Sequence, residues 1–169
     1  CPHCAALLAL GELEGRLRPR CPVCEFVLYR GPASATAGLV LDAAGQLLLV
    51  RRGIEPFRGA WALPAGYQEE DEAPERATER EVREETGIDA AQYPLVDWRI
   101  QNRFEVFRHW ASRFPPGTTH NTERVFGLTV PGRVPVVLEP REHLRYQWMS
   151  WQEAAALVFS WTNADALRM

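Results

Sequence analysis

The stretch GYQEEDEAPERATEREVREETGI, residues 66–88, sets the architecture of this chain. Its middle part predicts a helix over residues 73–85. Pro74 suits the first turn of a helix, because the N–H that proline lacks has no intrahelical partner there. The acidic residues before it favour the positive end of the helix dipole, and Gly87 suits a left-handed cap at the C-terminus. The sequence therefore marks both ends of this helix.

Three glutamates gather on one face of the predicted helix. At ~100° per residue, Glu81, Glu84 and Glu85 lie at about 0°, 300° and 40°. Like charges at these spacings destabilise a helix by roughly 0.2–0.5 kcal/mol per pair, so helix stability does not explain them. Carboxylate oxygens are the ligands that Mg²⁺ or Mn²⁺ prefers. The alternative is a solvated helix in which Arg80 and Arg83 form surface ion pairs of little value.

The spacing around these glutamates is more specific than the glutamates themselves. Nine positions over twenty-three residues read G-x5-E-x7-R-E-V-x-E-E-x-G-I. This pattern resembles the complete signature of the Nudix hydrolases. The resemblance implies an α/β/α sandwich whose signature segment, here called the box (residues 66–88), binds a divalent metal. It also implies hydrolysis of a nucleoside diphosphate linked to another moiety.

The same resemblance implies roles for individual residues of the box. It assigns the Mg²⁺ or Mn²⁺ ligands to three glutamates and one backbone carbonyl: Glu81, Glu84, Glu85 and Gly66. Arg80 is expected to orient a glutamate through a charge-assisted hydrogen bond, and Glu72 is expected to brace the box. The general base varies across the family, so Glu81, Glu85 and a loop glutamate all stand as candidates.

Strand-like segments surround the box. Residues 35–41 and 46–50 predict a hairpin joined by a turn over residues 42–45. Further strands are expected at residues 95–99, 103–107, 122–130, 134–138 and 146–149. Ser150 and Glu153 form a capping box that opens a helix over residues 151–159. Because strands and helices intermix, we predict an α/β sandwich around a mixed sheet, occupying residues 33–169.

The N-terminal part contains the four cysteines of the chain in two pairs. Their spacing, C-x2-C-x16-C-x2-C, is typical of zinc sites, and four thiolates fit a closed tetrahedral shell. About thirty residues cannot bury a stable core unaided, so a metal would supply the missing folding energy. Two disulfides are the alternative, although a cytosolic enzyme keeps its thiols reduced. We predict a structural zinc ribbon over residues 1–30, ligated by Cys1, Cys4, Cys21 and Cys24.

Composition and charge exclude several classes of function. All 19 basic residues are arginines, which excludes P-loop phosphate binding, pyridoxal Schiff bases and protein-kinase chemistry. The net charge of −3 argues against a non-specific nucleic-acid binder. The apolar runs are far shorter than the ~20 residues that cross a bilayer, and the sequence shows no signal peptide. We expect a cytoplasmic protein without a nucleic-acid or membrane partner.

Segments after the box resemble one group within the family, the bacterial dihydroneopterin triphosphate pyrophosphatases. These segments are FEVF (104–107), PPGTTHNTE (115–123), REHLRYQW (141–148) and SWTN (160–163). The resemblance implies release of pyrophosphate from dihydroneopterin triphosphate, with dATP and related nucleotides also accepted. It adds Glu142 to the metal ligands and assigns the substrate pocket to Arg51, Phe104, Glu105, Phe107 and Ser160. On pattern alone, Arg51 would be an exposed arginine, and Phe104 and Phe107 would be core aromatic residues. Three histidines lack a metal-ligand spacing and are left out of the site: His109, His120 and His143.

The predicted ribbon supports a rival substrate. A comparable ribbon precedes the box in NADH pyrophosphatases, so NADH or ADP-ribose is the main alternative to a pterin triphosphate. Those enzymes have an SQPWPFPxS-type motif after the box, and residues 88–169 contain none. A nucleotide-binding adaptor is a third option, which the intact glutamates disfavour. Nudix enzymes often form homodimers, and the sequence leaves the oligomeric state open.

Overall fold

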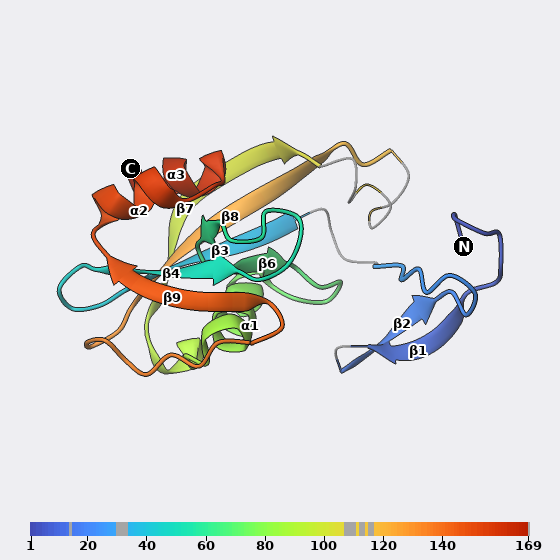
Figure 1. Cartoon of the computed structure of the whole chain (residues 1–169), viewed down its shortest axis with the longest axis horizontal. Helices are drawn as coiled ribbons and strands as arrows, with labels where there is room; N and C mark the ends of the chain where they lie inside the picture. The colour runs from blue at the N-terminus through green and yellow to red at the C-terminus, as the bar shows by residue number, and fades with distance from the viewer. Residues whose placement is uncertain (14, 30–33, 107–110, 112–113, 115–116, 169) are drawn as a thin grey trace.

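The computed structural model describes the chain except for residues 14, 30–33, 107–110, 112–113, 115–116 and 169. The described residues form two parts of unequal size (Figure 1). A small N-terminal hairpin lies to one side of a larger unit in which helices cover a β-sheet. None of the described helices is both long and apolar enough to pass through a bilayer.

The larger unit is built on a seven-stranded sheet. Its strands are β3 (Ser34–Leu41), β4 (Leu47–Arg52), β5 (Trp61–Ala62), β6 (Ala65–Tyr67), β7 (Leu95–Glu105), β8 (His120–Thr129) and β9 (His143–Met149). The main path runs β5-β4-β3-β8-β7, while β6 pairs with β3 and β9 pairs with β4. β3 and β8 are parallel, and the other pairs among the described strands are antiparallel. The sheet is therefore mixed, as predicted.

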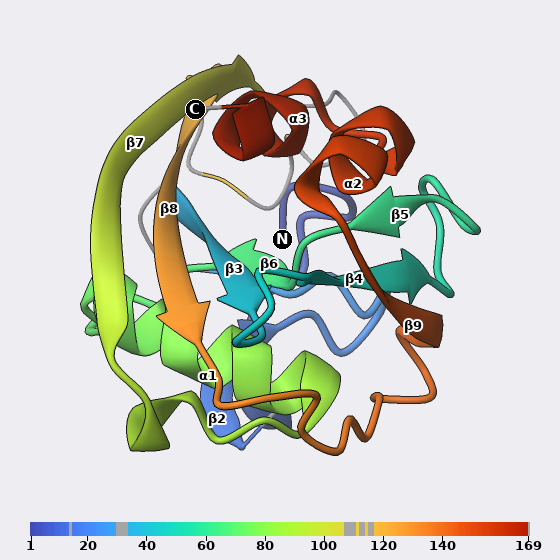
Figure 2. The same ribbon diagram turned by 90° about the vertical axis from the view of Figure 1, so that its left-hand side faces the viewer.

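Helices on both faces of this sheet complete the predicted α/β/α sandwich (Figure 2). α1 (Pro74–Thr86) and the 3-10 turn η1 (Ala90–Gln92) cover one face, and α2 (Trp151–Leu157) and α3 (Trp161–Arg168) cover the other. Successive side chains of a strand point to opposite faces. Leu39 therefore packs in the core beneath α2 and α3, whereas Val40 packs with Val82 in the core beneath α1.

The local signals at the helix ends are confirmed. α1 begins with Pro74 in its first turn and ends at Gly87, whose φ is 71° and whose N–H donates to the Arg83 carbonyl at 2.9 Å. At α2, the Ser150 side chain accepts the Glu153 N–H, and the Glu153 side chain accepts the Ser150 N–H. Each signal depends on a few neighbouring residues, which is why the sequence reveals it.

The strand expected at residues 134–138 is wrong. This segment runs along the end of α1, where Val137 donates its N–H to the Thr86 carbonyl at 2.8 Å. Pro135 has no N–H to contribute to a sheet ladder, which disfavours pairing here. Apolar residues of the segment still pack against the core on the α1 side. Val134 and Val136 are therefore partly buried without forming the expected strand.

Two further elements differ from the sequence-based expectation. The separate strands expected at residues 95–99 and 103–107 are replaced by one strand, β7, which shifts register between Asp97 and Ile100. Arg99 lies in this irregularity with a φ of 57°. α3 was not predicted, because its eight residues show only a weak apolar periodicity. Tertiary packing thus decides both elements.

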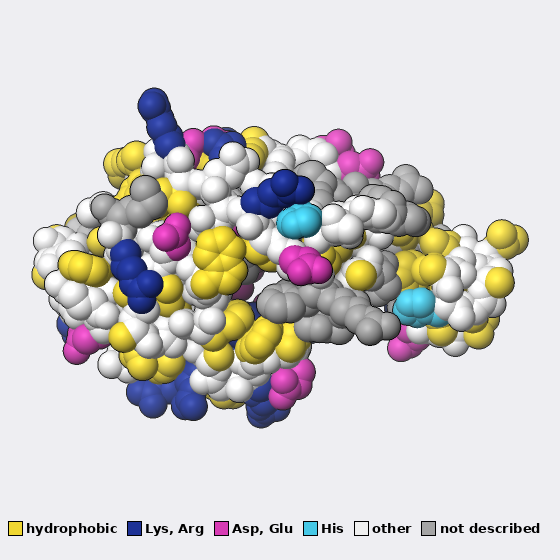
Figure 3. Space-filling view, turned by 90° about the horizontal axis from the view of Figure 1, so that it is seen from above, with side chains coloured by type: hydrophobic (Ala, Val, Ile, Leu, Met, Phe, Trp, Pro, Cys, Tyr) yellow, Lys and Arg dark blue, Asp and Glu magenta, His cyan; other side chains and the backbone are white. Residues whose placement is uncertain are grey.

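The N-terminal ribbon contains one antiparallel hairpin, β1 (Ala9–Leu13) and β2 (Arg16–Arg20). One cysteine pair precedes β1, and the other begins immediately after β2. Figure 3 shows apolar side chains exposed at the ribbon end of the molecule, and the most exposed are Leu7, Leu10, Leu17 and Val23. Apolar burial therefore contributes little to the stability of this small unit.

Candidate active site

α1 packs closely against β3, which directs the acidic side of the helix toward β6. A Cβ added at Gly38 in β3 would lie 2.7 Å from Cγ2 of Val82 and 3.4 Å from Cγ2 of Thr78. Only a residue without a side chain permits this approach of helix and strand. The close packing fixes the position of the glutamates that follow on the helix.

Gly66 in β6 makes room for the carboxylate of Glu81. A Cβ added at Gly66 would lie 2.1 Å from Cδ of Glu81 and 2.1 and 2.3 Å from its two oxygens. The carboxylate therefore lies directly beside the backbone of residue 66. This proximity is what the predicted ligand pair of a Gly66 carbonyl and a Glu81 carboxylate requires.

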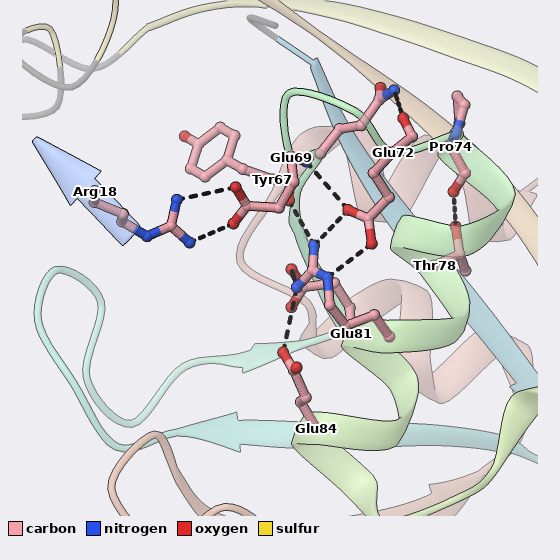
Figure 4. A network of polar contacts seen from close by, with 10 residues as sticks. Arg18, Tyr67, Glu69, Glu72, Pro74, Thr78, Glu81 and Glu84 are labelled. Carbon is pink, nitrogen blue, oxygen red and sulfur yellow. Dashed lines mark hydrogen bonds and ion pairs between the residues drawn. The ribbon is translucent and has the colours of Figure 1, made fainter. Parts of the chain in front are cut away.

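Arg80 links several parts of the box, and Figure 4 labels its partners Tyr67, Glu72, Glu81 and Glu84. Its guanidinium donates two hydrogen bonds of 2.9 Å to the Glu72 carboxylate and one of 2.9 Å to the Tyr67 carbonyl. Its Nη1 also donates to Oε1 of Glu81 at 2.7 Å and to Oε2 of Glu84 at 3.2 Å. Arg80 was expected to orient a glutamate, and the structure brings it together with three: Glu72, Glu81 and Glu84.

Glu85 lies in a polar group with His143, which is also buried, and with Glu142, which is exposed. One possible ligand atom from each of these residues lies within 4.8 Å of the others. Oε2 of Glu85 accepts the Ala65 N–H at 3.3 Å and lies 3.6 Å from Nε2 of His143. Sequence reasoning placed Glu142 here but missed His143, because only the pairing of β9 with β4 brings this histidine to the site. Its position next to Glu142 was the one available signal.

Burial raises the pKa values of two glutamates in the site. For Glu81, burial is the main cause, Arg80 opposes it, and the charge of Glu142 adds to it, which gives a pKa of about 7. Burial and the charges of Glu81 and Glu142 raise the pKa of Glu85 well above its usual range. Glu81, Glu85 and Glu142, here called the carboxylate cluster, therefore oppose one another's ionisation.

A hard divalent cation fits this donor set. It would neutralise charges that repel one another, and it prefers the oxygen ligands that the cluster offers. Burial, aided by the charge of Arg52, lowers the pKa of His143 to about 4, so this ring adds no positive charge at pH 7. Glu84, whose side chain is 55% exposed, also accepts a hydrogen bond from Arg80, and its charge helps to raise the pKa of Glu81.

Two of the predicted substrate residues have local partners. Nε of Arg51 donates to the Gly59 carbonyl at 2.7 Å, so the loop between β4 and β5 restrains this arginine. The Ser160 hydroxyl lies 2.7 Å from the Thr162 hydroxyl and accepts the Thr162 N–H at 3.3 Å. Ser160 therefore stabilises the start of α3, a contact that the sequence did not indicate.

The remaining predicted substrate residues lie at the end of β7. Phe104 and Glu105 pair with the first residues of β8, next to the start of β3. Gly66 pairs with Thr36 near the same end of β3. The strand register therefore places these two side chains toward the end of the sheet that also holds the box. Phe107 lies outside the described residues.

The four cysteines come together beside the hairpin. The Sγ atoms of Cys1 and Cys24 lie 3.4 Å apart, those of Cys4 and Cys21 3.4 Å apart, and those of Cys4 and Cys24 3.7 Å apart. All four are free thiols. The backbone N–H of Cys24 is the main cause that lowers the pKa of Cys21 to about 7, which favours the thiolate form. These spacings suit a Cys4 zinc site, in which each sulfur lies about 2.3 Å from the metal.

Comparison with known proteins agrees with this geometry. Residues 31–168 match the family described as the NUDIX domain. The chain is 36% identical over 142 residues to the dihydroneopterin triphosphate diphosphatase of Escherichia coli (strain K12), covering 83% of this chain and 92% of that one. It is 28% identical over 142 residues to the protein of the same name from Haemophilus influenzae, covering 83% and 87%. The structure of the E. coli dihydroneopterin triphosphate pyrophosphohydrolase matches with a TM-score of 0.72 at 33% identity, covering 83% of this chain and 95% of that chain.

Proposed function

We propose that this chain, which belongs to the Nudix hydrolase family, converts dihydroneopterin triphosphate to dihydroneopterin monophosphate and pyrophosphate. As a member of this family it is a hydrolase that acts on phosphoanhydride bonds of small nucleotide-type substrates. The names of two relatives that match most of its length support the pterin substrate. We include dATP and related nucleoside triphosphates as further substrates.

The carboxylate cluster beside Gly66 is the observation on which this function rests. We propose that Glu81, Glu85, Glu142 and the Gly66 carbonyl hold Mg²⁺ or Mn²⁺, with Glu84 as a further ligand from the exposed side. When bound, the cation neutralises phosphate charge, activates water and stabilises the leaving phosphate. Buried carboxylates that repel one another are a poor source of stability, which supports a role in binding a cation.

The protein's own groups position the carboxylates for proton transfer. Arg80 restrains Oε1 of Glu81, and the Ala65 N–H restrains Oε2 of Glu85. Water that attacks a phosphate must lose a proton, and a carboxylate oxygen of Glu81 or Glu85 would accept it.

We assign the substrate's phosphates and ring to different residues. With Nε restrained by Gly59, Arg51 would bind a phosphate through its terminal nitrogens, because a guanidinium fork matches phosphate oxygens. Phe104 would stack on the flat pterin or purine ring. We propose that three further residues complete the pocket: Glu105, Phe107 and Ser160.

A panel of four compounds tests the proposed reaction. Purified protein with Mg²⁺ is incubated with dihydroneopterin triphosphate, dATP, NADH or ADP-ribose, and the products are identified. Pyrophosphate and a pterin monophosphate are the expected products. Two monophosphates released from NADH or ADP-ribose, with no turnover of the pterin, would favour a dinucleotide pyrophosphatase. Binding without turnover of any compound would indicate an adaptor.

We further propose that residues 1–30 form a zinc ribbon distinct from the catalytic unit at residues 33–169. The approach of four free thiols supports this assignment. Four cysteines leave zinc no open position for water, so the metal would be structural. Elemental analysis should find about one zinc per chain, as expected for one closed Cys4 site. Fully folded protein without zinc would contradict this assignment.

A further inference from the structure

A partly buried ion pair joins the ribbon to the catalytic unit. Nη1 of Arg18 donates to Oε2 of Glu69 at 2.9 Å, and Nη2 donates to Oε1 at 2.6 Å. The two side chains are only 8% and 18% exposed, and the guanidinium lies 4.8 Å from the centroid of the Tyr29 ring. Exposed ion pairs contribute little, but a desolvated pair with two parallel hydrogen bonds fixes both partners in position.

The acidic partner belongs to the loop that leads into α1. Glu69 donates its N–H to Oε2 of Glu72 at 3.1 Å, and the Glu72 N–H donates to the Glu69 carbonyl at 3.3 Å. Glu72 in turn accepts two hydrogen bonds from Arg80, which also holds Glu81. Figure 4 shows this continuous series of contacts, which runs from Arg18 through the loop to a carboxylate of the proposed metal site.

Charge complementarity rather than apolar packing favours this contact. The hydrogen bonds from Arg18 lower the pKa of Glu69, and the charge of Arg16 on the same strand lowers it further. Leu10 and Leu17 of the hairpin remain exposed, so they do not anchor the ribbon to the catalytic unit. The basic side of β2 therefore meets the acidic loop before α1.

We propose that Arg18 is a positioning residue for the box, a role that rests on the function proposed above. Arg18 holds Glu69, and the loop that contains Glu69 holds the Glu72 carboxylate in place for Arg80. Arg80 then keeps Glu81 directed at Gly66. The ribbon thus braces the carboxylate cluster from outside, and Arg18 acts on catalysis without touching the substrate.

The test measures Mn²⁺ affinity by electron paramagnetic resonance and amide hydrogen exchange of residues 67–72 in the full chain. Arg18→Ala should weaken Mn²⁺ binding about tenfold and should speed amide exchange in this loop. A tenfold loss is the lower end of what is expected when a residue that holds a metal ligand in place is removed. Its kcat should fall while KM is unchanged, because Arg18 makes no substrate contact. Arg20→Ala is the matched control, since the ion pair of Arg20 with Glu25 is confined to the ribbon.

A charge reversal separates positioning from a general loss of stability. Arg18→Glu combined with Glu69→Arg should recover most of the Mn²⁺ affinity that either single variant loses. Glu69→Gln, which keeps the shape of the side chain, should behave like Arg18→Ala. The proposal is wrong if folded Arg18→Ala binds Mn²⁺ and exchanges its loop amides like the wild type. Neither readout needs a substrate, so a failure to hydrolyse dihydroneopterin triphosphate would contradict only the proposed function.

Discussion

Gly66 and Glu81 are so close that position 66 has no room for a side chain: an added Cβ would lie 2.1 Å from the carboxylate carbon. The two residues come from β6 and α1, and the loop between them contains Glu69 and Glu72. The signature therefore needs glycine at position 66, because any side chain there would overlap the Glu81 carboxylate. Strand, loop and helix act as one unit that presents a carboxylate next to a backbone carbonyl.

Gly66→Ala should displace the Glu81 carboxylate and lower kcat about 100-fold, the loss expected from a displacement of about 1 Å in an active site. The fold should persist, because β6 is a three-residue strand outside the main path of the sheet. Steady-state kinetics and circular dichroism measure the two effects. Gly132→Ala is the control, since no atom lies within 4 Å of a Cβ added there. Equal rates for both variants would exclude the steric role of Gly66.

Glu81→Gln and Glu85→Gln should each reduce turnover by about 10²–10⁴-fold, because each removes a carboxylate that holds the cation or accepts a proton. Neither should unfold the chain, since both replacements keep the side-chain volume and reduce charge repulsion. Pyrophosphate release is the assay. Glu79→Gln on the same helix is the control, because Glu79 pairs with the exposed Arg76. Wild-type rates in both active-site variants would overturn the assignment.

In metal-free protein, the contribution of Glu81 to stability should fall as the pH rises from about 4.5 to 7. The folded state raises the pKa of Glu81 from 4.5 to about 7 and therefore holds this proton more tightly than the unfolded chain. This contribution is most favourable at a pH below the pKa of Glu81 in the unfolded chain, and it is lost as the pH rises to the pKa in the folded chain. At about 1.4 kcal/mol per pKa unit, the loss is on the order of 3 kcal/mol. Glu85 acts in the same direction, whereas His143, whose pKa is lowered from 6.5 to about 4, adds stability as the pH rises over most of this range. The Glu81 contribution is therefore measured by comparison with a variant that lacks this carboxyl.

Urea unfolding at several pH values in a chelator measures this dependence. Glu81→Gln should lose less stability than the wild type between about pH 4.5 and 7, because it lacks the carboxyl that titrates in this range. Added Mg²⁺ should restore stability above pH 6, since the cation stabilises the ionised carboxylates. Parallel pH profiles for the wild type and Glu81→Gln would show that Glu81 is already ionised over this range without a cation.

Serine replacement of Cys21 and Cys24 should remove zinc and weaken Mn²⁺ binding about tenfold, to the level of Arg18→Ala. Arg18 lies three residues before Cys21, so loss of the ribbon structure should release its contact with Glu69. Adding Arg18→Ala to the serine variant should have no further effect, because both changes break one contact. Zinc analysis and Mn²⁺ titration measure the outcome. Fully additive losses would show that the ribbon and Arg18 act independently.

The box and the fold class were predictable because their signals are local. Pro74, Gly87 and the spacing of the glutamates depend on residues within a few turns of one helix. The alternation of Leu39 and Val40 likewise indicates a strand between two apolar layers. These features need no information about the rest of the chain.

Contacts between distant parts of the chain were not predictable in this way. Arg18 and Glu69 are 51 positions apart, and no spacing rule relates them. His143 reaches Glu85 only because β9 pairs with β4, a register that depends on the whole sheet. The segment at residues 134–138 shows the opposite error, because its apolar pattern suggested a strand where packing along α1 prevailed.

The most direct test is a crystal of the active enzyme soaked in Mn²⁺ and measured for anomalous scattering. We predict a manganese peak bound by Glu81 and Glu85, next to the Gly66 carbonyl. A fully active enzyme whose carboxylate cluster stays empty under these conditions would contradict the account.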